Sequence, residues 1–464
     1  MDKKKTRNLN PYILLFGVIA ACAVLSHFIA PGAFDRTVVN GKTVVVPDSF
    51  HAVEGSAGTL LDVFRAIPQG FMKAGPVVAI ILAIGGMLRI YDRTEAIPLG
   101  IYKLISKLGR KSATLIVIAF YLIFAILGGF LGWIETMLPF TPIVVAIMLA
   151  LGLDSMVAVA VTVVGMMAGF CAGPTNMLTV GISQSISELP TFSGLELRLA
   201  VWAIFVVISL AYILRYCAKI RKNPAASLVA DVDTSSLQYD FSQMEGKKMN
   251  TGQKLSLLAL LVTFIVVLYG MFNFGWNIND MTAAFLLCGV IAGLVNRMKG
   301  SEIVTELIEG SKTSMGGAMI VAVASGVQWI LEKTSIVDPI IYFLSNLLSN
   351  ASPFAAAIGI VLVVSLLNGL VPSGSGKAVA LLPLIIPLGD LVGLNRQITT
   401  LCYQFGDGLT NMIWFTYGSL LMFLSYGKIP YKKWVRFFAP LLIAFYIVAF
   451  VTLFIAIQIG YGPF

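Results

Sequence analysis

Long apolar runs separated by short polar stretches are the dominant pattern along this chain. The apolar runs lie at 11–30, 76–91, 113–131, 138–152, 156–180, 199–218, 255–272, 280–296, 315–331, 354–371, 379–392, 398–425 and 437–458. Several reach the roughly 20 residues that a helix needs to cross a bilayer, whereas others, of about 14–16 residues, are too short. Because lipid tolerates only backbone whose polar groups are satisfied, we interpret the short runs as arms of re-entrant hairpins. The pattern therefore predicts an all-α polytopic membrane protein.

A polar interruption of this pattern occurs twice. Phe170-Cys-Ala-Gly-Pro-Thr-Asn-Met177 returns 235 positions later as Phe405-Gly-Asp-Gly-Leu-Thr-Asn-Met412, and five of the eight residues are identical. Polar breaks that contain glycine, at corresponding places in two halves of a hydrophobic chain, indicate the binding site of a secondary transporter. We therefore predict one helix broken at 170–177 and another broken at 405–412.

The similarity extends beyond these two octets. Thr94 and Tyr102 are eight positions apart in one amphipathic stretch, as are Thr334 and Tyr342 in another. Each stretch leads into an apolar arm, a Gly-containing break and a second arm, so the sequence predicts two repeats, each with a re-entrant hairpin and a broken helix. The expected divisions are an N-terminal half at 1–218 with its hairpin tip at 132–137, a cytoplasmic linker at 219–252, and a C-terminal half at 253–464 with its tip at 369–377.

Charge orients the two halves relative to the membrane. The net charge is +9, but the basic residues cluster at the ends of apolar runs, which argues against a nucleic-acid partner. Basic clusters mark cytoplasmic loops. The first amphipathic stretch carries Lys103 and Lys107 and is expected inside, whereas its counterpart has only Lys333 at its start and is expected outside. The repeats are thus predicted to be inverted in the plasma (inner) membrane, with a cytoplasmic N-terminus, which carries Lys3, Lys4, Lys5 and Arg7.

Three charged side chains fall inside the apolar pattern. Glu135 and Lys377 lie in the two hairpin tips, and Asp407 lies in the second octet, where the first octet has Ala172. A charge within a membrane segment costs roughly 2.5–3.5 kcal/mol on insertion scales, so such residues are functional candidates by default. The alternative is that Glu135 and Lys377, on opposing tips, only neutralise each other.

Other polar residues of the tips and octets complete the candidate substrate site. Asn176 and Asn411 are placed to cap half-helices, whose N-termini attract carboxylates. The Ser/Gly turn of the second tip offers a nest for a carboxylate, and unwound carbonyls at Gly173 and Gly408 would suit a sodium ion. The predicted substrate-binding residues are Glu135, Thr136, Thr175, Asn176, Ser373, Gly374, Ser375, Gly376, Lys377, Asp407, Thr410 and Asn411.

Enzymatic motifs do not account for these residues. Gly374-Ser-Gly-Lys377 is similar to part of a phosphate-binding loop, but Val371 replaces the required glycine and Ala378 replaces the Ser or Thr that would hold magnesium. The two histidines and five cysteines form no cluster with metal-ligand spacing. The sequence therefore predicts no enzyme, no catalytic residue and no cofactor, with Na⁺ or H⁺ as the coupling ion if one is needed.

The second tip carries a family resemblance. Pro372-Ser-Gly-Ser-Gly-Lys-Ala378, followed by Leu-Leu-Pro383, resembles the second hairpin of the DcuC/YfcC family within the wider ion transporter superfamily, and the likeness extends over nearly the whole chain. The resemblance implies a scaffold domain, a transport domain with two opposed hairpins, and the homodimers and elevator-type movement common in the superfamily. Labels in this group range from C4-dicarboxylate carriers to arginine/ornithine-type antiporters. The Ser-Asn-Thr tips of the dicarboxylate branch are absent here.

Charge complementarity favours a secondary transporter that exchanges cationic amino acids, such as arginine for ornithine, by alternating access. Lys377 and the Ser373–Ser375 nest are expected to bind the substrate carboxylate, while Glu135 and Asp407 share its two cations. The alternative is a sodium- or proton-coupled carrier of C4-dicarboxylates, for which Lys377 offers the one evident cation. A third hypothesis, a receptor or scaffold without transport, leaves the paired breaks unexplained.

Overall fold

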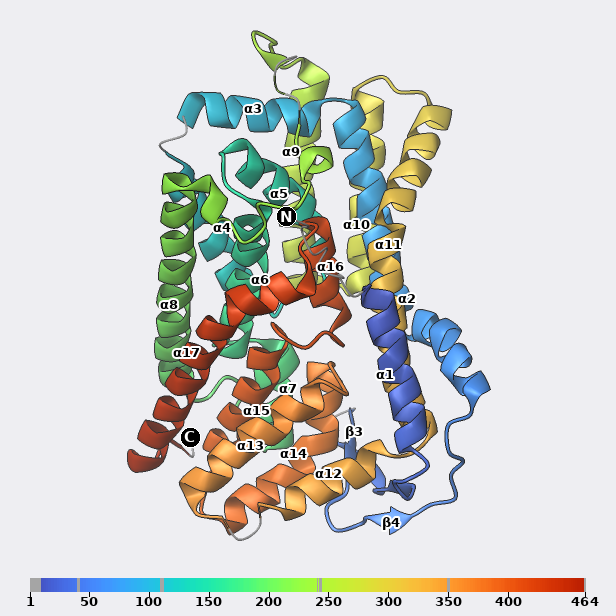
Figure 1. The fold of residues 1–464 in the computed structure, drawn as a ribbon, viewed down its shortest axis with the longest axis vertical. Coiled ribbons are helices and arrows are strands. Elements are labelled where there is room, and N and C mark those ends of the chain that lie inside the picture. The colour runs from blue at the N-terminus through green and yellow to red at the C-terminus, as the bar shows by residue number, and fades with distance from the viewer. Residues whose placement is uncertain are drawn as a thin grey trace, which may run out of the picture.

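Helices make up most of the computed structural model, which describes residues 10–39, 42–108, 112–239, 241, 244–348 and 351–462 (Figure 1). The basic residues Lys3, Lys4, Lys5 and Arg7 lie outside the described residues. The helices are α1 (Pro11–Leu25), α2 (Leu60–Arg93), α3 (Ala96–Leu108), α4 (Ala113–Ile126), α5 (Thr141–Ala150), α6 (Ser155–Cys171), α7 (Ile182–Ile186), α8 (Leu195–Lys222), α9 (Thr251–Phe274), α10 (Ile278–Val295), α11 (Gly300–Lys333), α12 (Val337–Asn346), α13 (Pro353–Asn368), α14 (Gly374–Leu391), α15 (Arg396–Thr410), α16 (Gly418–Tyr426) and α17 (Tyr431–Gln458).

Four short strands lie between α1 and α2. β1 (Gly32–Ala33) pairs with β4 (His51–Ala52), and β2 (Arg36–Val39) pairs with β3 (Lys42–Val45), both in antiparallel fashion. Arg36 forms an ion pair of 2.9 Å with Asp338 of α12. This contact attaches the strands to the end of the molecule at which α12 lies, the bottom of Figure 1.

Within the part of the chain that the structure describes, eight helices are long and apolar enough to cross a membrane. They are α2, α4 with its π-helical extension (Ala113–Leu131), α8, α9 (Thr251–Met271), α10, α11, α14 and α17. The structure is therefore mostly helical with several candidate spans, as expected of a polytopic membrane protein, although the short strands depart from the predicted all-α fold. The start expected at residue 76 for α2 is wrong, because the helix already begins at Leu60. Its first turns carry charges that interrupt the apolar pattern, such as Asp62, which pairs with Lys333 at 2.8 Å.

α2 and α11 correspond to each other in length and in position. Each has 34 residues, and both their first and their last residues are 240 positions apart. Each ends at a threonine C-cap, Thr94 or Thr334, which is followed by a residue in the left-handed region, Glu95 or Ser335. The amphipathic helix that follows, α3 or α12, lies at the top or the bottom of Figure 1. The similarity seen in the sequence thus extends to the helix boundaries.

Glycines bring α2 and α11 into close contact with each other. A Cβ atom on Gly70 would lie 2.7 Å from the backbone N of Gly326, and one on Gly310 would lie 2.7 Å from the Cα of Gly86. Such short distances leave no room for a side chain, so the two backbones pack directly on each other. With an offset of 240 positions, Gly70 corresponds to Gly310 and Gly86 corresponds to Gly326. Gly70 of α2 thus contacts Gly326 of α11, and their equivalents, Gly310 of α11 and Gly86 of α2, contact each other. This is the pattern of a two-fold contact between antiparallel helices.

Two helix pairs contain the predicted tips. α4 continues as a π-helical turn (Leu127–Leu131), and residues 132–137 connect it through a 3-10 turn (Leu138–Phe140) to α5. In the other half, residues 369–373 connect α13 to α14. Helices thus lie on either side of both predicted tips, and the assignment of these pairs as re-entrant hairpins stays a prediction.

The two predicted breaks differ in their structure. α6 ends at Cys171, and the chain resumes at a π-helical turn (Met177–Gly181), so a non-helical segment lies within the first octet. In the second octet the helix continues to Thr410, and the non-helical segment covers 411–417. The prediction that the break begins at the start of this octet is wrong. Its glycines serve close packing instead, since a Cβ atom on Gly408 would lie 2.2 Å from the Cβ of Cys171.

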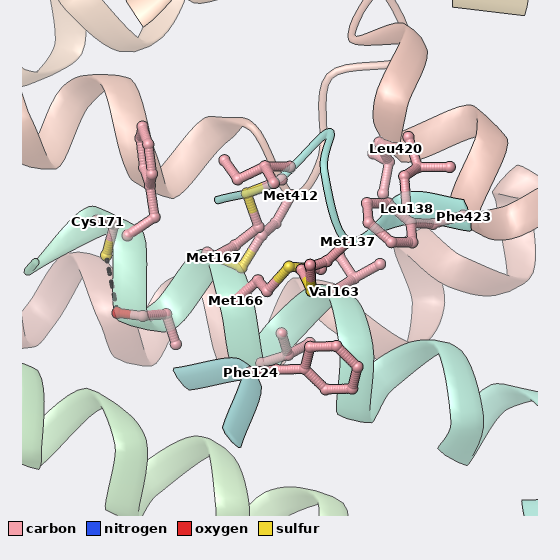
Figure 2. Close-up of a cluster of buried hydrophobic side chains, with 14 of the residues drawn as sticks. Phe124, Met137, Leu138, Val163, Met166, Met167, Cys171, Met412, Leu420 and Phe423 are labelled. Carbon is pink, nitrogen blue, oxygen red and sulfur yellow. Dashed lines mark hydrogen bonds between the residues drawn. The ribbon is translucent and has the colours of Figure 1, made fainter. Parts of the chain in front are cut away.

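A methionine-rich core joins the two halves next to these breaks. Figure 2 shows Met137 of the first tip and Met166 and Met167 of α6 beside Met412, the last residue of the second octet. All four are at most 2% exposed. Methionine side chains are flexible and fill irregular spaces. Met177, the counterpart of Met412 in the first octet, is instead 57% exposed.

Candidate functional site

A cavity of about 630 Å³ lies between the two tips and the helices α2, α10 and α11. Its volume is within the usual range for small-molecule sites, roughly 300–1,000 Å³. The first tip contributes Glu135 and Thr136, the second tip and the start of α14 contribute Ser373, Gly374 and Ser375, and the second break with the start of α16 contributes Asn411, Tyr417 and Ser419. Opposite them lie Lys73 of α2, Asn277 beside α10, and Ser325 and Gln328 of α11.

Glu135 is the acidic residue of the cavity wall. Its Oε1 accepts hydrogen bonds from Tyr417 Oη at 2.8 Å and from Ser419 Oγ at 3.3 Å. No lysine, arginine or histidine among the described residues pairs with it, so the alternative in which Glu135 and Lys377 neutralise each other does not hold. An unpaired carboxylate in a membrane protein is costly unless it meets a cation or a proton. The wall therefore provides a counter-charge for a cationic group.

The N-terminus of α14 faces the same cavity. Ser373 is its N-cap, and the Ser373 hydroxyl accepts a hydrogen bond from Gly376 N at 3.2 Å. The first backbone N–H groups of a helix have no partner within the helix, and they carry partial positive charge. Together with the exposed part of Ser375, this turn is suited to a carboxylate, as the sequence indicates.

Lys377 and Asp407 are buried behind this turn. Lys377 Nζ lies 2.8 Å from Asp407 Oδ1, and the side chains are 2% and 0% exposed. A Cβ atom on Gly374 would lie 2.9 Å from Asp407 Oδ2, so the absence of a side chain at Gly374 lets the carboxylate approach. Neither Lys377 nor Asp407 lines the cavity. In this conformation the two residues that were predicted to bind the substrate form an ion pair with each other instead.

Asn368, the last residue of α13, binds both Lys377 and the end of α15. Its Oδ1 accepts a hydrogen bond from Lys377 Nζ, and its Nδ2 lies 2.8 Å from Asn411 Oδ1 and 3.0 Å from Thr410 Oγ1. Asn411 therefore does not cap α16, whose N-cap is Tyr417, and that part of the prediction is wrong. The amide of Asn368 instead joins the second tip to the end of α15.

The first octet shows a related but uncharged arrangement. Thr175 Oγ1 donates to Phe130 O at 3.1 Å, which connects this break to the π-helical turn before the first tip. Asn176 Oδ1 accepts from Leu178 N at 2.9 Å, so its predicted capping role is confirmed. Gly132 has φ +71°, and a Cβ atom there would lie 2.4 Å from Asn176 Oδ1. The first tip thus lies close to its octet asparagine, as the end of α13 lies close to Asn411.

Two π-helical turns flank this first-half site, Leu127–Leu131 before the tip and Met177–Gly181 after the break. Such turns make up well under 1% of residues in soluble proteins and occur frequently at functional sites. They widen the helix locally, which allows the backbone near the cavity to depart from the α-helical register.

The predicted substrate residues thus fall into two groups. Those that line the cavity are Glu135, Thr136, Ser373, Gly374, Ser375 and Asn411. Those outside the cavity lining are Thr175, Asn176, Gly376, Lys377, Asp407 and Thr410. The second group supports the walls formed by the first.

Sequence reasoning missed several polar residues of the site. Asn368 is a single polar residue at the end of an apolar run, which is a signal that was available. Lys73 precedes the apolar run 76–91, and Gln328 lies within the run 315–331 but was not singled out; both side chains bond to Glu332, at 2.6 and 2.8 Å. Ser419 and Tyr417 follow the octet in a stretch with no recognisable pattern.

The carbonyl groups suggested for sodium have other surroundings. Gly173 O accepts a hydrogen bond from Gln404 Nε2 at 2.9 Å. Gly408 lies within α15, so the expectation that it belongs to unwound chain is wrong. Among the described residues, no group of three or more His, Cys, Asp or Glu side chains is arranged to hold a metal ion.

The eight candidate spans of the described residues indicate a multi-pass membrane protein, and the comparisons place it among transporters. The chain belongs to the DcuC family, described as C4-dicarboxylate anaerobic carriers, whose profile matches residues 10–458. It is 29% identical to the protein of Escherichia coli (strain K12) named "Putative basic amino acid antiporter YfcC", over 97% of this chain and 96% of that one. An uncharacterized protein of Haemophilus influenzae is 27% identical over 86% of this chain and 79% of its own length.

Two solved transporter structures are also similar to the chain. The YdaH transporter of Alcanivorax borkumensis matches with a TM-score of 0.43 and 14% identity, over 98% of this chain and 100% of that one. MtrF of Neisseria gonorrhoeae matches with a TM-score of 0.46 and 16% identity, over 97% of this chain and 95% of that one.

Proposed function

We propose that this protein is a secondary transporter that exchanges cationic amino acids of the arginine/ornithine kind, by alternating access around the cavity between the two tips. The observation that carries the proposal is Glu135, an acid in the cavity wall with no basic partner among the described residues. A cationic substrate group would neutralise this carboxylate, and its exchange for a second cation would preserve the charge. The name of the Escherichia coli relative, a basic amino acid antiporter, supports the same substrate class.

Within this proposal, the substrate carboxylate lies at the N-terminus of α14, next to Ser373 and Ser375. The distal cation binds Glu135, with Tyr417 and Ser419 orienting the acid. Lys377 and Asp407 do not contact the substrate in this conformation, because they are paired behind the cavity wall.

Alternating access is proposed to rest on two inverted repeats with re-entrant hairpins. Support comes from α2 and α11, which have equal length and exchange equivalent glycine contacts, Gly70 with Gly326 and Gly86 with Gly310. An axis in the membrane plane relates the halves of many such transporters. The homodimer and the coupling ion, Na⁺ or H⁺, remain part of the proposal, as does the cytoplasmic N-terminus.

The description of the family favours a second candidate, a carrier of C4-dicarboxylates. Such a substrate requires two positive groups. Lys73 lies in the cavity wall, but its Nζ is 2.6 Å from Glu332, which already neutralises it. The carboxylate Glu135 would also repel a dianion.

Ligand-induced stabilisation of the purified protein distinguishes the two candidates. Anything that binds the native state raises the melting temperature as its concentration exceeds Kd. We expect saturable shifts with arginine and ornithine, a smaller one with the neutral analogue citrulline, and none with succinate or fumarate. A shift with succinate but none with any cationic amino acid would contradict the proposal and support the second candidate.

A further inference from the structure

The ammonium group of Lys377 is surrounded by oxygen atoms of three kinds. Asp407 supplies a carboxylate oxygen at 2.8 Å, Val371 a backbone carbonyl at 3.3 Å, and Asn368 an amide oxygen that accepts a hydrogen bond. Carboxylate, carbonyl and amide oxygens are the ligands of hard metal cations in proteins. The Lys377 Nζ atom therefore occupies the centre of a group of oxygens that would suit such a cation.

The position of Lys377 in its helix gives no other reason for a positive charge. The residue lies in the first turn of α14, where the backbone already contributes partial positive charge and a cation is unfavourable. It is also buried, which removes the charge from water. The surrounding oxygens offset both costs. Asp407 Oδ2 has no hydrogen-bond donor among the described residues, so this carboxylate retains capacity for a further ligand.

The equivalent place in the first half is built without these charges. Ala172 stands where the second octet has Asp407, and Gly132 approaches Asn176 as Asn368 approaches Asn411. The acid, the amide and the lysine thus belong together as one feature of the second half.

We propose that Lys377 is a built-in cation, which permanently occupies a monovalent-cation site formed by Asp407, Asn368 and the Val371 carbonyl. The second half then needs no dissociable ion, such as sodium, at this position. The role of this site in transport rests on the proposed function. The site itself does not depend on the identity of the substrate. Because Lys377 also adjoins the Gly374 turn, the tethered charge holds the carboxylate-binding end of the cavity in place.

Removal of the Lys377 amine should leave a site that binds a dissociable cation such as sodium. In Lys377→Ala the oxygens of Asp407, Asn368 and Val371 remain and the volume of the lysine side chain is freed for a sodium ion and water. The matched control, Lys377→Ala combined with Asp407→Asn, has the same space but no carboxylate. Both variants and the unaltered full-length protein are compared in sodium chloride and in choline chloride at equal ionic strength.

Two readouts are measured on these proteins. The first is the melting temperature in detergent as sodium replaces choline, which requires no substrate. We expect a saturable rise of a few degrees for Lys377→Ala, clearly larger than for the unaltered protein or the double variant. The second is arginine/ornithine exchange in liposomes, where we expect Lys377→Ala to be roughly tenfold faster in sodium than in choline, because its binding-competent fraction increases.

The melting temperatures test whether Lys377 is a built-in cation. The exchange measurement tests the proposed substrate independently. A sodium-induced rise without exchange of any cationic amino acid would retain the cation site and overturn the substrate. Equal melting temperatures of Lys377→Ala in sodium and choline would overturn the built-in cation. If Lys377→Ala is too unstable to purify in choline, recovery in sodium supports the proposal, and failure in both salts, with the double variant recovered, overturns it.

Discussion

The hydroxyl of Tyr417 donates to Glu135 Oε1 over 2.8 Å, and so connects the break of the second half to the tip of the first. The acid of one half is therefore oriented by a residue of the other. This relationship places the cavity at the meeting point of both halves, where a relative movement of the halves would change the surroundings of Glu135.

Glu135→Gln should weaken the binding of cationic substrates and leave the fold intact. The change removes a charge-assisted interaction of roughly 1.5–3 kcal/mol, which corresponds to an increase in Kd of about ten- to a hundredfold. Glutamine keeps an oxygen for Tyr417 and Ser419. Binding of arginine and of citrulline is measured by melting-temperature titration, with Glu188→Gln as control, since Glu188 is 80% exposed and pairs with Arg396. Equal losses for both ligands would contradict a role of Glu135 in cation binding.

The ion pair between Lys377 and Asp407 should show strong coupling in a double-mutant cycle. Asp407→Asn or Lys377→Met alone leaves a buried charge without a partner, and each should lower stability by about 3–5 kcal/mol. The double variant removes both charges, so we expect it to be more stable than either single variant. Unfolding by heat or denaturant in detergent measures the cycle. Additive losses would show that the two side chains do not interact.

Contact between α2 and α11 should make Gly70 intolerant of any side chain. A Cβ atom there would lie 2.2 Å from the backbone O of Ala322, so Gly70→Ala must separate the helices, at a cost of about 1–3 kcal/mol. Gly75→Ala in the same helix is the control, because a Cβ atom there meets nothing within 4 Å. That variant should be neutral or slightly stabilised through the higher helix propensity of alanine. The two melting temperatures are compared, and similar values would refute the close contact.

Arg198 should support the first break. This buried arginine of α8 donates from Nε to Pro174 O at 3.3 Å and from Nη2 to Ser193 O at 2.5 Å. Arg198→Leu leaves both carbonyls without this donor, and each lost charge-assisted bond costs roughly 1.5–3 kcal/mol. We expect lower stability and slower exchange, both partly restored in Arg198→Lys. The control is Arg215→Leu, a change at an exposed position of the same helix. Full activity of Arg198→Leu would contradict this supporting role.

The sequence predicted the helices well and the side-chain partners poorly. Apolar runs and the repeated octet were sufficient to place most helices and the end of α6 in the first octet, because these features follow from local composition. The second break was misplaced, since the glycines of the octet serve close contacts with other helices, Gly406 with Val364 and Gly408 with Cys171. Asp407 and Lys377 were assigned to the substrate because both are charged, and their pairing depends on a tertiary contact across 30 positions that no local pattern contains.

The proposed exchange activity is tested most directly by counterflow in liposomes that contain the purified protein. The liposomes are loaded with unlabelled ornithine, and the entry of labelled arginine is followed at equal ionic composition on both sides. We predict rapid transient accumulation of arginine that requires internal ornithine, is blocked by external lysine, and is strongly reduced in Glu135→Gln. Arginine entry that is independent of internal ornithine, or absent while succinate exchanges readily, would contradict the account.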